Sequence, residues 1–358
     1  MIIRRVFPVL FLLFTGTLVA SEHNSVYINS FTFYDSEPVP FQRFEKSWGK
    51  GFRGGNSAIS YVNHELGFSL GSWGFGYVSR SASYVQFGTE TAALVNILAQ
   101  KRPIYGDGFL VDVRVKSFNA TGARLFYQLF ERRKIRMQIG ASLLQADRLV
   151  DGSLKGRLAV ISQSDYRFEN IVLDYFYSVD KLFDHQVAQP KGRGFALDTR
   201  IFWSPTPRLA FKLNIGDILG RINWQDAPYT LATIESDNKA YDENGYVKVD
   251  PLLKGKQLTK SFTQYLPVYF LISSEMRLRE SYSLLFELES VGVKSYPRGG
   301  LRKQISRQYA ADLIFDPLNR VLGLRFSHAV FHISVASDSL DINNAYMVSA
   351  SAGIRWGF

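Results

Sequence analysis

The feature that most constrains the fold of this chain is a repeated alternation of apolar and polar residues with a period of two. From Tyr346 to Phe358, apolar or aromatic residues fall on one parity, and mostly small or polar residues fall on the other. Segments 109–116 and 135–143 alternate in the same way. Period two is the pattern of a β-strand with one apolar face. The chain is therefore predicted to be all-β, with many antiparallel strands.

A hairpin is predicted within the stretch GFALDTRIFWSPTPRLAFKLNIGD, residues 194–217. Apolar residues alternate with polar ones on both sides of the connection Ser204-Pro-Thr-Pro207. Prolines cannot donate hydrogen bonds to a strand ladder, so they favour a tight turn here. Short connections of this kind indicate strands that follow one another up and down.

The placement of aromatic residues favours a membrane barrel over a soluble β-sandwich. Apart from the N-terminal segment, no window approaches the ~20 apolar residues of a membrane helix. Phe, Trp and Tyr nevertheless make up 15% of the chain, and Tyr or Trp recurs near predicted strand ends, for example at Tyr177, Trp203 and Trp224. Such positions are typical of the interfacial girdles of barrels whose apolar face contacts lipid.

The N-terminus has the layout of a secretory signal peptide over residues 1–20. Arg4 and Arg5 precede the apolar run Val6 to Phe14, and small or polar residues follow. We expect cleavage at Ala20 or Ser21. The alternative is an uncleaved membrane anchor, but a run of about nine residues is too short to span ~30 Å of hydrocarbon. Because the chain has no cysteine, neither a disulfide framework nor a lipidated cysteine is available.

Together, the export signal, the pervasive alternation and the final strand resemble the outer-membrane β-barrel proteins of Gram-negative bacteria. In that class the last strand typically ends in Phe or Trp and is read by the barrel-assembly machinery. The resemblance implies an assembly signal at Tyr346, Ile354, Trp356 and Phe358. The hairpin around SPTPRLAFKLNIGDI is similar to those of long-chain fatty-acid-transporter-type barrels, and no ligand residue is carried over from it.

The length of the chain sets the size of the predicted barrel. At roughly 20–24 residues per strand with its share of loop, about 14–16 strands are expected, in one transmembrane antiparallel up-and-down barrel over residues 56–358. Residues 21–55 alternate poorly and are expected to form a periplasmic tail, a rim, a plug in the lumen or an irregular first strand. Residues 225–259 predict a large extracellular loop with a turn at Asn244-Gly245, and residues 91–101 fit either a helix or a strand.

If the apolar parity faces lipid, the charged residues of the other parity face the lumen. Both signs are present, as a wet or ion-paired lumen requires, because a charge on the lipid face costs about 2–4 kcal/mol at mid-depth. The candidates are Asp112, Arg114, Lys116, Arg124, Arg136, Asp198, Arg200, Lys212, Glu287, Glu289 and Arg325. Either they line a conduit, or they pair across strands and close it.

The predicted function is a channel or transporter for small solutes in the cell outer membrane, with a mixed-charge lumen rich in Arg and Lys. The alternative is a closed structural or surface-interaction barrel. Expected partners are outer-membrane lipid, lipopolysaccharide and the assembly machinery. Nucleic acid is not expected, since the basic residues are dispersed. No enzymatic activity, cofactor or metal site is predicted: His328 and His332 are close in sequence, but a triad is defined by geometry.

Overall fold

The computed structural model describes residues 24–46, 48–132, 134–162, 165–180, 186–236, 239–241, 247–249 and 252–358. The predicted signal peptide and its cleavage site lie outside these residues, and so does the predicted turn at Asn244-Gly245. Within the described residues, no helix is long and apolar enough to cross a membrane.

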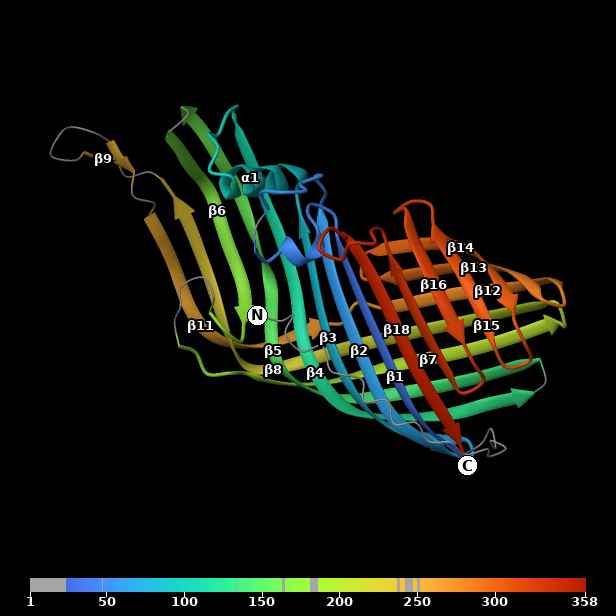
Figure 1. The fold of residues 1–358 in the computed structure, drawn as a ribbon. Helices are drawn as coiled ribbons and strands as arrows, with labels where there is room; N and C mark the ends of the chain where they lie inside the picture. The colour runs from blue at the N-terminus through green and yellow to red at the C-terminus, as the bar shows by residue number, and fades with distance from the viewer. Residues whose placement is uncertain are drawn as a thin grey trace.

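Fourteen strands of the described chain pair side by side into a closed antiparallel ring, which confirms the predicted up-and-down barrel (Figure 1). The ring closes between its first and last strands, in register from Ser25 opposite Gly357 to Asp35 opposite Met347. Its strands are β1 (Asn24–Ser36), β2 (Ser57–Leu70), β3 (Trp73–Phe87), β4 (Gly108–Arg132), β5 (Ile135–Ser162), β7 (Lys191–Thr206), β8 (Leu209–Glu235), β12 (Tyr269–Arg279), β13 (Tyr282–Val291), β14 (Lys294–Gln304), β15 (Ala310–Asp316), β16 (Val321–Ser327), β17 (Phe331–Ser337) and β18 (Met347–Gly357).

The outer surface of the ring carries an apolar belt. Ile28, Phe75, Ile139, Trp203 and Phe286 each expose about two fifths or more of their surface, on strands that lie on different sides of the ring. Such exposure is unfavourable in water and is the expected lipid contact of a transmembrane barrel.

The two ends of the barrel differ in their connections. Asn24 and Phe358 lie together, since the amide of Phe358 donates to the carbonyl of Asn24. Several connections at this end are tight turns, such as residues 71–72, 207–208 and 280–281. The opposite end carries the long connection 37–56. Because periplasmic turns are short and outer loops long in this class, we call these the periplasmic end and the outer end.

One side of the barrel continues beyond the belt as a tall wall. The outer halves of β5 and β8 pair with β6 (Asp165–Tyr177), and β8 also pairs with β11 (Leu252–Tyr265). Figure 1 shows these strands rising on one side, whereas β12 to β17, which we call the short wall, lie on the other. The predicted large loop at 225–259 is therefore wrong in large part, because β8 runs to Glu235 and β11 begins at Leu252. Between them, β9 (Lys239–Tyr241) pairs with β10 (Val247–Val249).

A helix packs against the tall wall. The ambiguous segment forms α1 (Thr89–Ala99), whose Leu94 joins Ile104, Val111 and Leu158 in a buried apolar cluster. Val111 and Leu158 belong to β4 and β5, so the helix covers alternating apolar residues that otherwise would face solvent above the belt. A short 3-10 helix, η1 (Phe41–Arg43), lies in the connection between β1 and β2.

The predicted start of the barrel at residue 56 is wrong, because β1 already belongs to the ring. Its alternation is hard to read because the apolar parity changes along the strand. Near the periplasmic end, the apolar Ile28 faces outward. Near the outer end, the apolar Phe33 is fully buried inside the barrel, and the polar Thr32 has the outward-facing parity of Ile28. Where a strand passes from lipid into an apolar barrel interior, its apolar residues move from the outward face to the inward face. A prediction that expects one constant apolar face therefore does not recognise such a strand.

Candidate functional site

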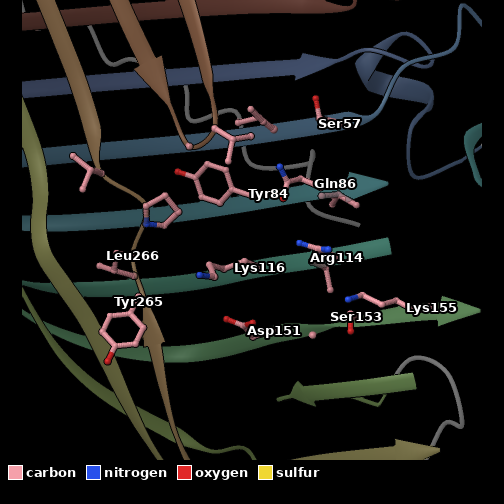
Figure 2. Close-up of a pocket in the computed structure, with 18 residues that line it drawn as sticks. Ser57, Tyr84, Gln86, Arg114, Lys116, Asp151, Ser153, Lys155, Tyr265 and Leu266 are labelled. Atoms are coloured by element: carbon pink, nitrogen blue, oxygen red, sulfur yellow. The ribbon is translucent and has the colours of Figure 1, made fainter. Parts of the chain in front are cut away.

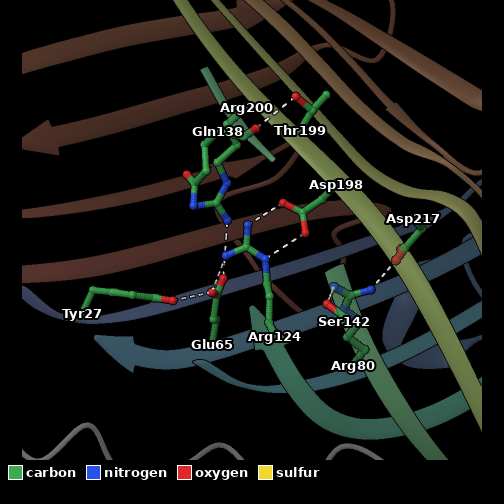
Figure 3. A network of polar contacts seen from close by, with 10 residues as sticks. All are labelled: Tyr27, Glu65, Arg80, Arg124, Gln138, Ser142, Asp198, Thr199, Arg200 and Asp217. Atoms are coloured by element: carbon green, nitrogen blue, oxygen red, sulfur yellow. Dashed lines mark hydrogen bonds and ion pairs between the residues drawn. The ribbon is translucent and has the colours of Figure 1, made fainter. Parts of the chain in front are cut away.

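The lumen holds a central ion-pair layer, shown in Figure 3. The Arg124 guanidinium from β4 donates through Nη1 to Glu65 Oε1 at 2.8 Å and through Nε to Asp198 Oδ2 at 2.8 Å, and a second nitrogen contacts the other Asp198 oxygen. Tyr27 donates to the same Glu65 oxygen at 2.7 Å, and Arg200 approaches Oε2 at 3.4 Å. Arg124 and Glu65 are each only 3% exposed. Three predicted lumen residues, Arg124, Asp198 and Arg200, are thus brought together from strands distant in sequence.

A second buried pair, Arg80 with Asp217, completes this layer. Arg80 from β3 contacts the Asp217 carboxylate and reaches Ser142 Oγ at 3.3 Å. Asp217 lies in β8 with φ +58°, and Leu219 follows with φ +53°. Two left-handed residues so close together interrupt the regular strand, and the Asp217 carboxylate reaches Arg80 from this irregular segment. Sequence reasoning missed Arg80, Glu65 and Asp217, because the lumen-facing residues of segment 57–87 were not predicted and the β8 irregularity is invisible in the alternation.

A second group of ion pairs lies nearer the periplasmic end. Arg302 binds Asp312 at 2.7 Å and Glu275 at 2.6 Å, and Arg325 binds Glu287 at 2.8 Å. Arg302, Glu275, Arg325, Glu287 and Lys212 line a cavity of about 260 Å³, which we call the periplasmic cavity. Asp312 is not a cavity-lining residue, but its Oδ2 accepts from both Arg302 and Arg325.

The remaining predicted lumen residues are more dispersed. Glu289 pairs with Arg298 at 2.7 Å, Arg136 lies over the Phe202 ring, and Asp112 lies 3.7 Å from Arg114 near the outer end. The predicted candidates therefore do not form one site. Whether any of them contacts a solute stays a prediction.

On the outer side of the ion pairs, an apolar cluster fills the lumen; we call it the outer closure. Its members come from strands on all sides of the ring and from the link between β11 and β12. They include Phe33, Tyr84, Phe118, Leu149, Trp224, Leu266, Val291, Tyr296 and Met347, all buried. Trp224 is 1% exposed, so its predicted place in an interfacial girdle is wrong. Tyr177 is buried to the same degree, whereas Trp203 is exposed as predicted.

The tips of the short wall contribute to the outer closure. The β13–β14 turn at Gly292 has φ +65° and lies so close to the Tyr84 ring that a Cβ at this position would collide with it. Just before the β11–β12 link, the Gln264 side chain donates to the Ser117 carbonyl of β4 at 3.3 Å. The turn and the link are thus folded inward, toward the opposite wall.

Polar contacts hold the same tips to β1. The Tyr296 hydroxyl donates to Asp35 Oδ2 at 2.7 Å, and Lys294 Nζ lies 2.8 Å from the same oxygen. Lys294 also pairs with Glu37 at 2.6 Å. Burial by itself raises the pKa of the Glu37 carboxyl, but hydrogen bonds from the Asn56 amide and from Lys294 outweigh it, so the pKa lies below its ordinary value.

Above the outer closure is a pocket of about 700 Å³, drawn in Figure 2, which we call the outer pocket. Its floor includes Tyr84 and Leu266, while Arg114, Lys116 and Lys155 supply positive charge and Asp151 supplies negative charge. Asp151 accepts a hydrogen bond from the Gln264 amide at 3.1 Å. The pocket therefore combines an apolar floor with a mostly cationic wall.

A third cavity, of about 290 Å³, lies at the central ion-pair layer, beside Arg80, Arg124 and Tyr269. The lumen formed by the described residues thus includes the outer pocket, this central cavity and the periplasmic cavity. The groups between them are side chains of the outer closure and of the ion pairs.

The predicted assembly residues do not all lie together. Ile354, Trp356 and Phe358 are exposed near the periplasmic end of β18, the strand at the ring's closing seam. Tyr346 lies at the opposite end, just before β18, where its hydroxyl donates to the Gly51 carbonyl and Arg53 lies over its ring. Recognition of these residues by the assembly machinery stays a prediction.

Comparisons with known proteins complete the description. No protein-family model and no curated protein matches the chain. Solved structures that overlap it include the Pseudomonas putida toluene transporter TodX, at 9% identity and a TM-score of 0.41 over 94% of this chain and 88% of that one. The Ralstonia pickettii toluene transporter TbuX overlaps at 11% identity and a TM-score of 0.33, over 94% and 90% of the two chains. A Pseudomonas aeruginosa FadL homologue overlaps at 9% identity and a TM-score of 0.36, over 93% and 87%.

At these identities and TM-scores the overlap carries no information about ligands. The fold assignment rests instead on the closed strand pairing and the exposed apolar belt described above. On that evidence, the described residues form a closed fourteen-stranded up-and-down β-barrel with an exposed apolar belt.

Proposed function

We propose that this protein is a transporter for small solutes in the outer membrane of a Gram-negative bacterium, with a lumen that side chains close in the state described here. The observation that carries the proposal is the series of three cavities within the ring, of about 700, 290 and 260 Å³. Side chains can change rotamer on fast timescales, so a lumen closed by them is able to open without breaking the strand ladder.

The lining of the lumen supports solute passage over a purely structural role. A barrel that only needed a filled interior would be more stable with apolar packing than with many buried ion pairs, because desolvating charges is costly. Here charged residues of both signs surround the central and periplasmic cavities. Such a polar lining suits the passage of hydrated or charged groups. We also propose that the chain catalyses no reaction.

Because the sequence contains no cysteine, single introduced cysteines provide a clean test. Ser153 lines the outer pocket and Ser204 lines the periplasmic cavity. In planar bilayers we expect current through the wild-type protein, and we expect a charged thiol reagent to block that current in Ser153→Cys from the outer side and in Ser204→Cys from the periplasmic side. Ser306→Cys, in an exposed connection between β14 and β15, is the matched control and should keep its current after labelling.

The closed structural barrel is the alternative outcome. Folded protein that carries no current and transports no solute, with or without cysteine substitutions, would support that alternative. Folding is checked by heat-modifiable migration on gels, so that absence of current in misfolded protein is not counted.

A further inference from the structure

The periplasmic cavity has an excess of positive charge. Five cations line it, Arg208, Lys212, Arg277, Arg302 and Arg325, against the two carboxylates Glu275 and Glu287. Arg302 and Arg325 are engaged by Glu275, Glu287 and Asp312 at 2.6 to 2.8 Å. Within the described part of the chain, no carboxylate pairs with the other three within 4 Å.

Lys212 is the centre of this imbalance. It lies on β8, between Phe202 of β7 and Ser273 of β12, and its side chain lines the cavity. Arg302 and Arg325 act on it as like charges, and Glu275 and Glu287 act on it as opposite charges. The Lys212 side chain is exposed to the cavity, and cations that outnumber the carboxylates around them favour the approach of a further negative charge. An anion inside the cavity would supply that charge and would meet Arg208 and Arg277 as well.

The size and polarity of the cavity restrict the anion. At about 260 Å³ it is smaller than the sites that take drug-sized ligands, which begin near 300 Å³. The hydroxyl-bearing residues Ser204 and Ser273 lie in its wall beside the cations. Charge-assisted hydrogen bonds from ammonium and guanidinium groups are strong for carboxylate and phosphate oxygens. The cavity therefore fits a compact oxyanion, or the anionic group of a larger solute.

The charge imbalance extends to both ends of the lumen. Toward the periplasm, Arg136 lies over the Phe202 ring at 4.7 Å, beside the cavity that Phe202 lines. At the outer end, the outer pocket contains Arg114, Lys116 and Lys155 against Asp151. Positive charge at both mouths concentrates anions and repels cations along such a path.

We propose that the periplasmic cavity is a binding site for a compact carboxylate or phosphate anion, centred on Lys212, and that the lumen consequently selects anions. The selectivity rests on the transport function proposed above, because it names the charge of the transported solute. The binding site itself does not depend on transport and can be measured in protein that carries no current.

The binding test uses the full-length mature protein folded in detergent, with inorganic phosphate as the first probe and acetate as the second, by isothermal titration calorimetry. We expect Lys212→Gln to weaken binding about tenfold, as expected for loss of one charge-assisted contact. Lys212→Arg should retain most of the affinity. Lys191→Gln, which removes the same charge at an exposed residue that begins β7, is the matched control and should bind as the wild type does.

Reversal potentials in a KCl gradient test the selectivity of the same variants. We expect the wild type and Lys191→Gln to prefer chloride, and Lys212→Gln to lose at least part of that preference. The proposed site would be overturned if each anion bound equally well to wild type, Lys191→Gln and Lys212→Gln. It would also be overturned if neither anion bound to any of the three proteins. If Lys212→Gln fails to fold, Arg277→Gln is judged by the same criteria.

The two measurements separate the two proposals. Anion binding that depends on Lys212, in protein that carries no current, supports the site and contradicts the transport function. Current without anion preference, in protein that binds phosphate independently of Lys212, supports transport and overturns this inference.

Discussion

The lumen is closed in two chemically different ways, by the apolar outer closure and by the central ion-pair layer. In the outer closure, residues such as Trp224 and Leu266 exclude water through packing, and the tips that carry some of them are held by contacts to β1. In the central layer, Arg124 neutralises Glu65 and Asp198 within hydrogen-bond distance. An apolar solute can replace apolar neighbours at little cost, whereas parting buried ion pairs leaves unpaired charges.

This difference indicates that the two closures open to solutes of different polarity. The outer closure can yield to a solute that brings an apolar surface, and the central layer to one that brings its own charge or water. Three changes test the contrast between them, from the largest expected effect to the smallest.

Arg124→Gln should have the largest effect, because it leaves the buried carboxylates of Glu65 and Asp198 without their principal cation. Removing one partner of a buried ion pair typically costs about 3–5 kcal/mol. The free energy of unfolding is measured by urea titration of the protein in lipid vesicles, with tryptophan fluorescence as the signal. The control, Arg114→Gln, removes an exposed guanidinium 3.7 Å from Asp112 and should change stability by less than about 1 kcal/mol. Equal losses in the two variants would contradict a special role for the central layer.

Leu266→Ala should weaken the outer closure by a smaller amount. Truncating a buried leucine costs about 2–5 kcal/mol, and the lower half of that range is expected here because water can enter from the adjacent outer pocket. The same change should increase single-channel current, since it opens the floor of the pocket. Tyr265→Ala, at the exposed neighbour in the chain, is the control and should leave unfolding nearly unchanged. A loss of stability without any rise in current would mean that Leu266 is not part of the barrier.

Glu37 should give the smallest effect, and one that depends on pH. Its pKa is lowered in the folded protein, so its contribution to stability is present above its ordinary pKa and is lost as pH falls through the lowered value. At neutral pH, Glu37→Gln should therefore cost less than about 1 kcal/mol, since the side chain is one third exposed. The difference between wild type and variant should shrink as the pH falls below the ordinary carboxyl range, as followed by urea midpoints. If the difference in stability between wild type and Glu37→Gln grew toward acid pH, the direction of the Glu37 pKa shift would be contradicted.

Much of the architecture could be predicted from the sequence, because lipid imposes a regular pattern. Strands such as β5, β7 and β18 place apolar residues at every second position over the belt, and this is visible without any coordinates. The reversed apolar parity of β1 and the extension of β8 and β11 beyond lipid were not predictable in the same way. In β1 and in these extensions, the apolar residues contact protein rather than lipid. The rule that the apolar side of a strand faces outward therefore does not hold there.

The sequence by itself determined a cysteine-free chain whose alternating strands form a membrane barrel and place charged residues inside it, and it predicts an export signal. Only the tertiary structure decided which charges meet and where the lumen closes. Lys294 binds Asp35 from 259 residues away, and Arg80 binds Asp217 from 137 residues away. Such contacts depend on strand register, on the irregularity in β8 and on the inward fold of the short-wall tips. Alternation fixes the face of a strand on which a side chain lies, but not the residue that it meets across the barrel.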